Sequence, residues 1–169
     1  MRALLGRDGW TVRAVDWGSL PPNPGLWADH VRTVARPAVA ELTSSGQLLL
    51  VAKSLGTHAA RLAAERDLPG VWLTPLLRDD ADQRAAYAGM ASPALIVGGT
   101  ADPLWSSQEA EALRRNGWSD PPGARSVVGL ADLDHALEVP GDPVASVRAC
   151  ADVMTQVEEF LGRLGSRGA

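Results

Sequence analysis

Residues 48–57 of the chain read LLLVAKSLGT. The apolar run ends at the small residue Ala52, a serine follows at Ser54, and Gly56 comes two positions after it. This pattern predicts a buried strand over residues 48–53 that turns sharply into a helix over residues 55–67, with Ser54 at the tip. Small residues on both sides of the serine let the strand and helix backbones approach closely. The motif is a variant of the G-x-S-x-G nucleophile elbow, in which the serine hydroxyl is exposed and the next backbone amide, that of Leu55, faces an oxyanion.

Two other interpretations of this stretch compete with a nucleophile. Ser54 can be an ordinary turn residue between small neighbours. Lys53-Ser54 also matches the end of a phosphate-binding P-loop, but that loop requires glycines where this chain has Gln47 and Ala52. The P-loop is therefore set aside, and the rest of the chain has to decide between a turn and a nucleophile.

Apolar strands alternate with helices along the chain, which predicts the α/β class: a three-layer, doubly wound, mostly parallel sheet. The predicted strands are residues 10–16, 48–53, 71–74, 94–99 and 125–129. The predicted helices are residues 2–8, 26–45, 55–67, 79–89, 106–115 and 144–164. The last helix carries one apolar stripe, formed by Val144, Val147, Ala151, Met154, Val157, Leu161 and Leu164.

Composition narrows the class of protein. A chain of 169 residues predicts a single domain, over residues 1–165, followed by a frayed tail at 166–169. The net charge of −4 and the scattered basic residues argue against a nucleic-acid partner. The single cysteine, Cys150, excludes a disulfide framework and a cysteine-based metal site. The chain has no signal-peptide pattern and no apolar run of membrane-spanning length, so we expect a soluble cytoplasmic protein that does not associate with a membrane.

An acid and a histidine follow two later strands. Asp102 comes just after the strand at 94–99, and His135 comes after the strand at 125–129. The carboxyl ends of parallel strands share one edge of the sheet, so both residues are expected beside Ser54. A serine nucleophile needs a base to take its proton and an acid to orient that base. The order serine, aspartate, histidine therefore predicts a catalytic triad of Ser54, Asp102 and His135.

Each of these assignments has a competing interpretation. Asp102 can be a turn or helix-capping residue, and His135 a surface loop residue. Asp79 and Asp80 follow the strand at 71–74 and are an alternative position for the acid. Four further residues are not favoured as members of the site, because they lie too close in sequence to His135 or on predicted helices: Asp132, Asp134, His30 and His58.

With Lys53-Ser54-Leu55-Gly56, Gly98-Gly99-Thr100-Ala101-Asp102-Pro103 and Asp134-His135, the chain resembles the α/β-hydrolase superfamily over nearly its whole length. It looks most like the small, lidless bacterial hydrolases of the dienelactone-hydrolase and carboxylesterase type. The resemblance also implies a strand that separates the one at 10–16 from the one at 48–53, followed by a loop that provides the second oxyanion amide. This chain has neither. We therefore expect that Met1 is an internal methionine and that the working protein begins upstream. Otherwise, either residues 10–16 shift to pair with residues 48–53, or a gap leaves backbone groups unpaired at a heavy energetic cost.

The function expected from the sequence is that of a serine esterase acting on a small ester or related acyl substrate through an acyl-enzyme. No cofactor and no metal are implied. Trp17, Thr74 and Trp105 follow strand ends and are expected to line the pocket, unless they are packing residues. The alternative function is a non-catalytic α/β-hydrolase-like interaction protein, or a fragment with an incomplete oxyanion hole. An uncovered strand edge would favour pairing of the chain into a homo-oligomer.

Overall fold

The computed structural model describes residues 1–7, 9–43, 46–120 and 124–165 of the 169-residue chain. The predicted tail at 166–169 lies outside the described residues. Twelve elements follow one another along this part of the chain, and helices alternate with strands from the middle of the chain onward.

The described strands form one four-stranded parallel sheet. The strands are β1 (Leu50–Lys53), β2 (Gly70–Leu73), β3 (Ala94–Gly99) and β4 (Arg125–Leu130), and their order in the sheet is the order in the chain. The register pairs Leu50 with Gly70, Gly70 with Ala94, and Ala94 with Arg125, so all four strands start at the same edge. The general α/β class and these four predicted strands are confirmed.

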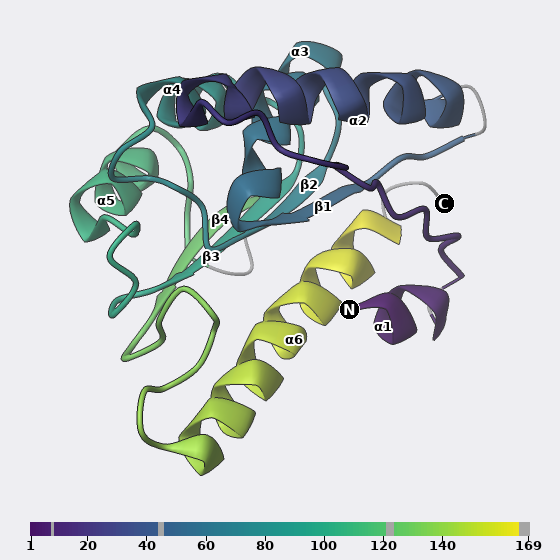
Figure 1. Ribbon diagram of the computed structural model, residues 1–169. Coiled ribbons are helices and arrows are strands. Elements are labelled where there is room, and N and C mark those ends of the chain that lie inside the picture. The colour runs from purple at the N-terminus through teal and green to yellow at the C-terminus, as the bar shows by residue number, and fades with distance from the viewer. Residues whose placement is uncertain (8, 44–45, 121–123, 166–169) are drawn as a thin grey trace.

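Helices cover both faces of the sheet (Figure 1). One face carries α2 (Trp27–Thr43), α3 (Ala60–Arg66), α4 (Ala81–Gly89) and α5 (Ser107–Arg115). The other face carries α1 (Arg2–Arg7) and α6 (Pro143–Gly165). There are also two short 3₁₀ helices, η1 (Pro24–Leu26) and η2 (Ser54–Ala59). Pro37 lies inside α2, which continues through it to Thr43.

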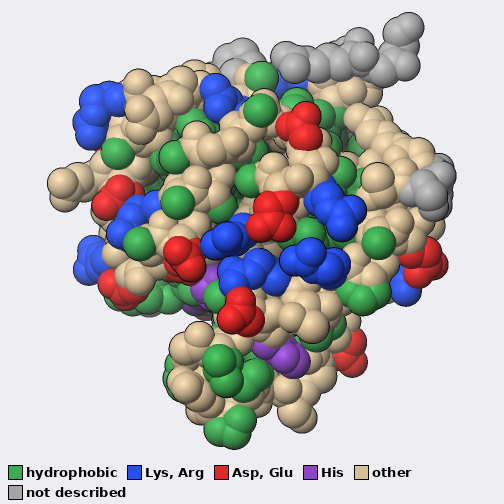
Figure 2. Space-filling view, turned by 90° about the horizontal axis from the view of Figure 1, so that it is seen from above, with side chains coloured by type: hydrophobic (Ala, Val, Ile, Leu, Met, Phe, Trp, Pro, Cys, Tyr) green, Lys and Arg blue, Asp and Glu red, His purple; other side chains and the backbone are tan. Residues whose placement is uncertain are grey.

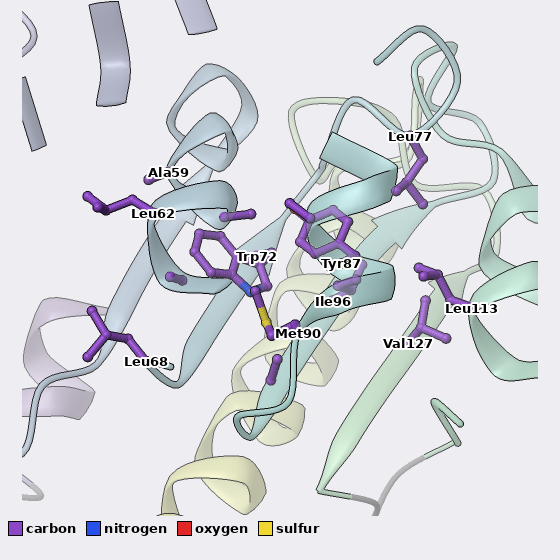
Figure 3. Packing of buried hydrophobic residues seen from close by; sticks show 14 of the residues in the cluster. Ala59, Leu62, Leu68, Trp72, Leu77, Tyr87, Met90, Ile96, Leu113 and Val127 are labelled. Carbon is purple, nitrogen blue, oxygen red and sulfur yellow. The ribbon is translucent and has the colours of Figure 1, made fainter. Parts of the chain in front are cut away.

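The core on the α2–α5 face is centred on Trp72 of β2 (Figure 3). Its ring centroid lies 6.1 Å from that of Tyr87 on α4, and the two ring planes are inclined by 58°. A Cβ atom on Gly70 would lie 2.3 Å from the Trp72 ring, so the glycine makes the space that the indole fills. On the opposite face a second cluster joins α6 to β2 and β3, with Val157, Phe160 and Leu161 buried against Val71 and Leu95.

Three sequence predictions need correction. Residues 10–16 form no strand, because the segment pairs with no neighbouring strand of the described chain. The predicted helix at 55–67 begins as the 3₁₀ helix η2 and becomes α-helical only at Ala60. The apolar stripe of the last helix is buried only in its second half: Val144 and Val147 are 61% and 71% exposed, because this end of α6 extends past the strands (Figure 1).

A cavity of about 550 Å³ borders β1. β1 is an edge strand that pairs with β2 alone among the described residues. The cavity walls come from residues 10–15 with Trp17, from the inward side of α2, and from residues 48–53. The segment at 10–16 therefore runs near β1, but a cavity separates the two, and no hydrogen-bonded ladder joins them.

The molecular surface mixes charges of both signs. On the face shown in Figure 2, Lys and Arg side chains are interspersed with Asp, Glu and apolar side chains. In the part of the chain that the structure describes, no helix has both the length and the apolar character that crossing a membrane requires.

Candidate active site

Ser54 lies directly after β1, at the first position of η2. Its φ angle is +53°, in the left-handed region that non-glycine residues rarely occupy. Such strain in a residue between a strand and a helix is typical of a nucleophile elbow. A Cβ atom placed on Gly56 would lie 3.4 Å from the Cβ of Ala52 and 3.5 Å from the Trp17 ring, so this position has room for a methyl group and little more.

His135 bonds Ser54 with one ring nitrogen and Asp102 with the other. The distance from Ser54 Oγ to His135 Nε2 is 2.7 Å, and that from His135 Nδ1 to Asp102 Oδ2 is 2.8 Å. The carboxylate of Asp102 can only accept, so Nδ1 carries the proton and Nε2 is left as the acceptor for the Ser54 hydroxyl. The three residues predicted from the sequence are therefore brought together in the geometry that proton transfer from serine to histidine requires.

Asp102 is held in place by burial and by its second oxygen. Its side chain is fully buried, and Oδ1 accepts a hydrogen bond of 2.8 Å from the backbone N–H of Leu104. The side chain of His135, in contrast, is 31% exposed. The acid is thus shielded from water, while the base lies where a substrate can approach it.

Glycine lets the His135 loop approach the end of β3. A Cβ atom on Gly99 would lie 2.0 Å from the backbone oxygen of Leu133, and the Ala101 N–H donates to that same oxygen at 3.0 Å. Any side chain at position 99 would therefore push away the loop that carries His135.

Lys53 makes a contact to this loop that the sequence did not predict. Its Nζ donates to the backbone oxygen of His135 at 2.9 Å and so ties the end of β1 to the loop after β4. A lysine next to a serine carries no signal of such a contact, because the partner is 82 residues away along the chain.

A buried polar network lies beneath the elbow and was also not predicted. Thr57 Oγ1 donates to the backbone oxygen of Ser54. Gln83 Nε2 of α4 donates to Thr57 Oγ1 at 2.9 Å, and Gln83 Oε1 accepts from the Leu76 N–H at 2.7 Å. The elbow is thus hydrogen-bonded to α4 and to the loop after β2.

His58 and Asp80 form a separate ion pair between the same two elements. His58 Nδ1 lies 2.9 Å from Asp80 Oδ2, and Asp80 Oδ1 caps α4 by accepting from the Gln83 N–H at 2.8 Å. Burial raises the pKa of Asp80, but the hydrogen bond and charge of His58 and the N–H groups of Gln83 and Asp82 lower it by more, so the net pKa lies below the ordinary 3.8. Asp80, which was a second candidate for the triad acid, pairs with His58 and not with His135.

The remaining histidine and aspartates considered from the sequence lie outside the relay. His30 Nε2 lies 2.7 Å from the backbone oxygen of Trp17. Asp134 Oδ1 accepts from the N–H groups of Ala136 and Glu138 and so shapes the loop around His135. Asp79 and Asp132 have no described contact with His135.

The three residues expected to line a pocket lie in different surroundings. Trp17 lines the cavity beside β1. Thr74 is fully buried at a φ of +45°, and its hydroxyl has no hydrogen-bond partner among the described residues. Trp105 is buried against Gly98, where a Cβ atom would lie 2.1 Å from its ring. Thr74 and Trp105 are therefore buried and do not line the cavity beside β1, and their place in a substrate pocket stays a prediction.

Within the described ranges, no group of three or more His, Cys, Asp or Glu side chains could hold a metal ion. Comparison of the chain with protein-family models, with curated proteins and with solved structures finds no match in any of the three. The site geometry and the fold are therefore the basis for a functional assignment.

Proposed function

We propose that this chain is a serine hydrolase of the α/β-hydrolase type, with Ser54 as nucleophile, His135 as general base and acid, and Asp102 as the residue that orients His135. The observation that carries the proposal is the hydrogen-bonded relay from Ser54 through His135 to the buried Asp102. These residues follow β1, β4 and β3, and their order in the chain is that of the α/β-hydrolases. The three side chains come from separate segments of the chain, and their arrangement matches the roles of nucleophile, base and orienting acid in a serine hydrolase.

In the proposed reaction, His135 Nε2 takes the proton of the Ser54 hydroxyl as Ser54 Oγ attacks the acyl carbon of an ester. The negative charge passes to the carbonyl oxygen, and the backbone N–H of Leu55 donates to it. The helix itself provides no partner for an N–H in its first turn, so this donor is available to the substrate. The tetrahedral intermediate then breaks its bond to the alcohol oxygen, which leaves with the proton held by His135.

The resulting acyl-enzyme is hydrolysed by the same residues. His135 removes a proton from a water molecule, whose oxygen attacks the acyl carbon. Ser54 Oγ is then expelled and regains its proton from His135, and the acid product leaves. Small or exposed acyl groups are the proposed substrates, because the connection from β2 to α4 is short and forms no lid over the site.

The test is labelling with a fluorophosphonate probe together with hydrolysis of p-nitrophenyl acetate. We expect the unaltered chain to react with the probe and turn over the ester, and the Ser54→Ala variant to do neither. Ser107→Ala is the matched control: this serine is exposed at the start of α5, and its substitution should leave both signals unchanged. If the folded chain shows no Ser54-dependent labelling or turnover, the proposal is wrong, and a non-catalytic interaction protein becomes the better assignment.

A further inference from the structure

The network of Thr57 and Gln83 has a defined direction. The Leu76 N–H can only donate, so the Gln83 atom that faces it at 2.7 Å has to be the amide oxygen. The amide nitrogen of Gln83 then faces Thr57 Oγ1, at 2.9 Å, and donates to it. The Thr57 hydroxyl, having accepted this bond, directs its own hydrogen to the backbone oxygen of Ser54. A fixed donor in the loop after β2 thereby determines the direction of every bond up to the elbow.

The end of this chain of bonds is the peptide group between Ser54 and Leu55. In a trans peptide the carbonyl oxygen and the N–H lie in one plane and point in opposite directions. A hydrogen bond that holds the Ser54 oxygen on the buried side therefore keeps the Leu55 N–H pointing to the opposite side. Ser54 itself is held at a φ of +53°, where the backbone of a serine is strained.

We propose that Thr57 and Gln83 are positioning residues that hold the Leu55 N–H toward the oxyanion of the transition state. This inference rests on the proposed hydrolase function. Both side chains are buried, with exposed fractions of 0% and 3%, and neither can contact a substrate. They act through the orientation of one peptide group and not through contact with the reacting atoms.

A purely structural role, in which the network only joins α4 to η2, is the competing explanation. The ion pair of His58 and Asp80 allows the two roles to be separated, because it joins the same two elements without touching the Ser54–Leu55 peptide. Loss of that ion pair loosens α4 but leaves the hydrogen bond from Thr57 to the Ser54 oxygen in place. Asp80→Asn is therefore the matched control.

The test compares Thr57→Val, Thr57→Ser, Gln83→Met and Asp80→Asn in kcat, KM and Tm with p-nitrophenyl acetate. Removal of a whole oxyanion donor lowers kcat about a hundred- to a thousandfold, and misorientation of one should lower it about ten- to a hundredfold. We expect this fall for Thr57→Val and Gln83→Met, with KM unchanged within about twofold. Thr57→Ser keeps the hydroxyl and should restore kcat, whereas Asp80→Asn should lower Tm and leave kcat unchanged.

Two outcomes would overturn the inference. If Thr57→Val lowers Tm but keeps the full kcat, the network is only structural. If Asp80→Asn lowers kcat as much as Thr57→Val does, the effect comes from loosening of α4.

A readout that needs no activity separates this inference from the proposed function. The amide ¹H and ¹⁵N chemical shifts of Leu55 should change in Thr57→Val and Gln83→Met and stay constant in Asp80→Asn. If the unaltered chain has no Ser54-dependent turnover, the proposed function fails, and the Leu55 shifts still decide whether the network orients this peptide. Unchanged shifts in Thr57→Val would contradict the orientation itself.

Discussion

The carboxyl end of β1 and the outer edge of β1 are built differently. At the carboxyl end, Ser54 and Lys53 are joined by hydrogen bonds to the loop after β4, and the elbow is joined to α4 through Thr57. Along the outer edge, the strand faces a cavity of about 550 Å³, and residues 10–16 make no ladder with it. The side-chain hydrogen bonds described for the elbow thus come from residues that follow it in the chain, whereas the part before β1 meets it through packing of α2 and Trp17.

The volume of the cavity can be compared with that of a strand. Neighbouring strands lie about 4.8 Å apart, packed layers about 10 Å apart, and a strand rises about 3.3 Å per residue. The product of these three lengths is about 160 Å³ per strand residue. By that measure the cavity has the volume of about three residues of strand. The resemblance to α/β-hydrolases implies a further strand at this edge, and that expectation stays a prediction.

The largest effect is expected from Asp102→Asn, which disrupts the hydrogen bonds at the carboxyl end of β1. Asp102→Asn should keep the bond from Leu104 N–H to the side-chain oxygen, but its amide nitrogen would donate to His135 and place the imidazole proton on Nε2. His135 Nε2 would then carry a proton and could not accept the proton of the Ser54 hydroxyl, so we expect kcat to fall by about 10³- to 10⁴-fold. Kinetics with p-nitrophenyl acetate, beside circular dichroism to show an intact fold, measure this.

Asp132→Asn is the control for that change. Asp132 is exposed in the loop before His135 and, at a φ of +60°, adopts a conformation that asparagine tolerates. Its substitution should leave kcat unaltered. Equal activity losses in the two variants would mean that loop charge, and not the orientation of His135, governs the rate.

The second prediction compares the loss of stability from a truncated side chain at the outer edge of β1 with the loss from one in the centre of the sheet. Leu95 of β3 is fully buried, so Leu95→Ala should lower the free energy of unfolding by about 3–5 kcal/mol through lost burial and a new cavity. Leu50 of β1 is half-buried and already lines a cavity, so Leu50→Ala should lower it by about 1 kcal/mol. Urea denaturation of both variants tests the difference, and equal losses would show that the outer edge is packed as tightly as the centre.

The smallest effect concerns the ion pair that supports the elbow from α4. The pKa of Asp80 is lowered in the folded state, so its ionised form stabilises the fold above the unfolded-state pKa of 3.8, and this contribution is lost as the pH falls through the lower folded value. At about pH 5 we expect Asp80→Asn to lower the free energy of unfolding by about 1–2 kcal/mol. The gap in Tm between the two proteins should narrow as the pH falls below 3.8 and through the lower folded-state pKa; a gap that stays constant with pH would rule out the charge of Asp80 as its cause.

Much of the sheet and the three triad positions could be predicted from the sequence. A short apolar run bounded by proline and glycine, such as residues 94–99, favours a strand covered on both faces, and parallel strands bring the residues after them to one edge. Ser54, Asp102 and His135 needed no more than that rule and the chemistry of their side chains.

The remaining features depend on contacts that no local pattern encodes. Residues 10–16 alternate like a strand, but a strand also requires a neighbour to pair with. Val144 and Val147 keep the helical spacing of a buried stripe, but they lie at the start of α6, which extends beyond the sheet and leaves them exposed. The partnership of Thr57 with Gln83 joins residues 26 positions apart, and it follows from where α4 packs and not from either residue's surroundings in the sequence.

The distance along the chain between Ser54 and His135 sets the earliest time during synthesis at which the site can form. The two residues are 81 positions apart and follow the first and the last strand of the sheet. During synthesis at about 5–20 residues per second, the ribosome adds His135 some 4–16 s after Ser54. Until then Ser54 has no His135 beside it. Under the proposed function, a fluorophosphonate should therefore label only those molecules in which the strands that carry both residues have assembled.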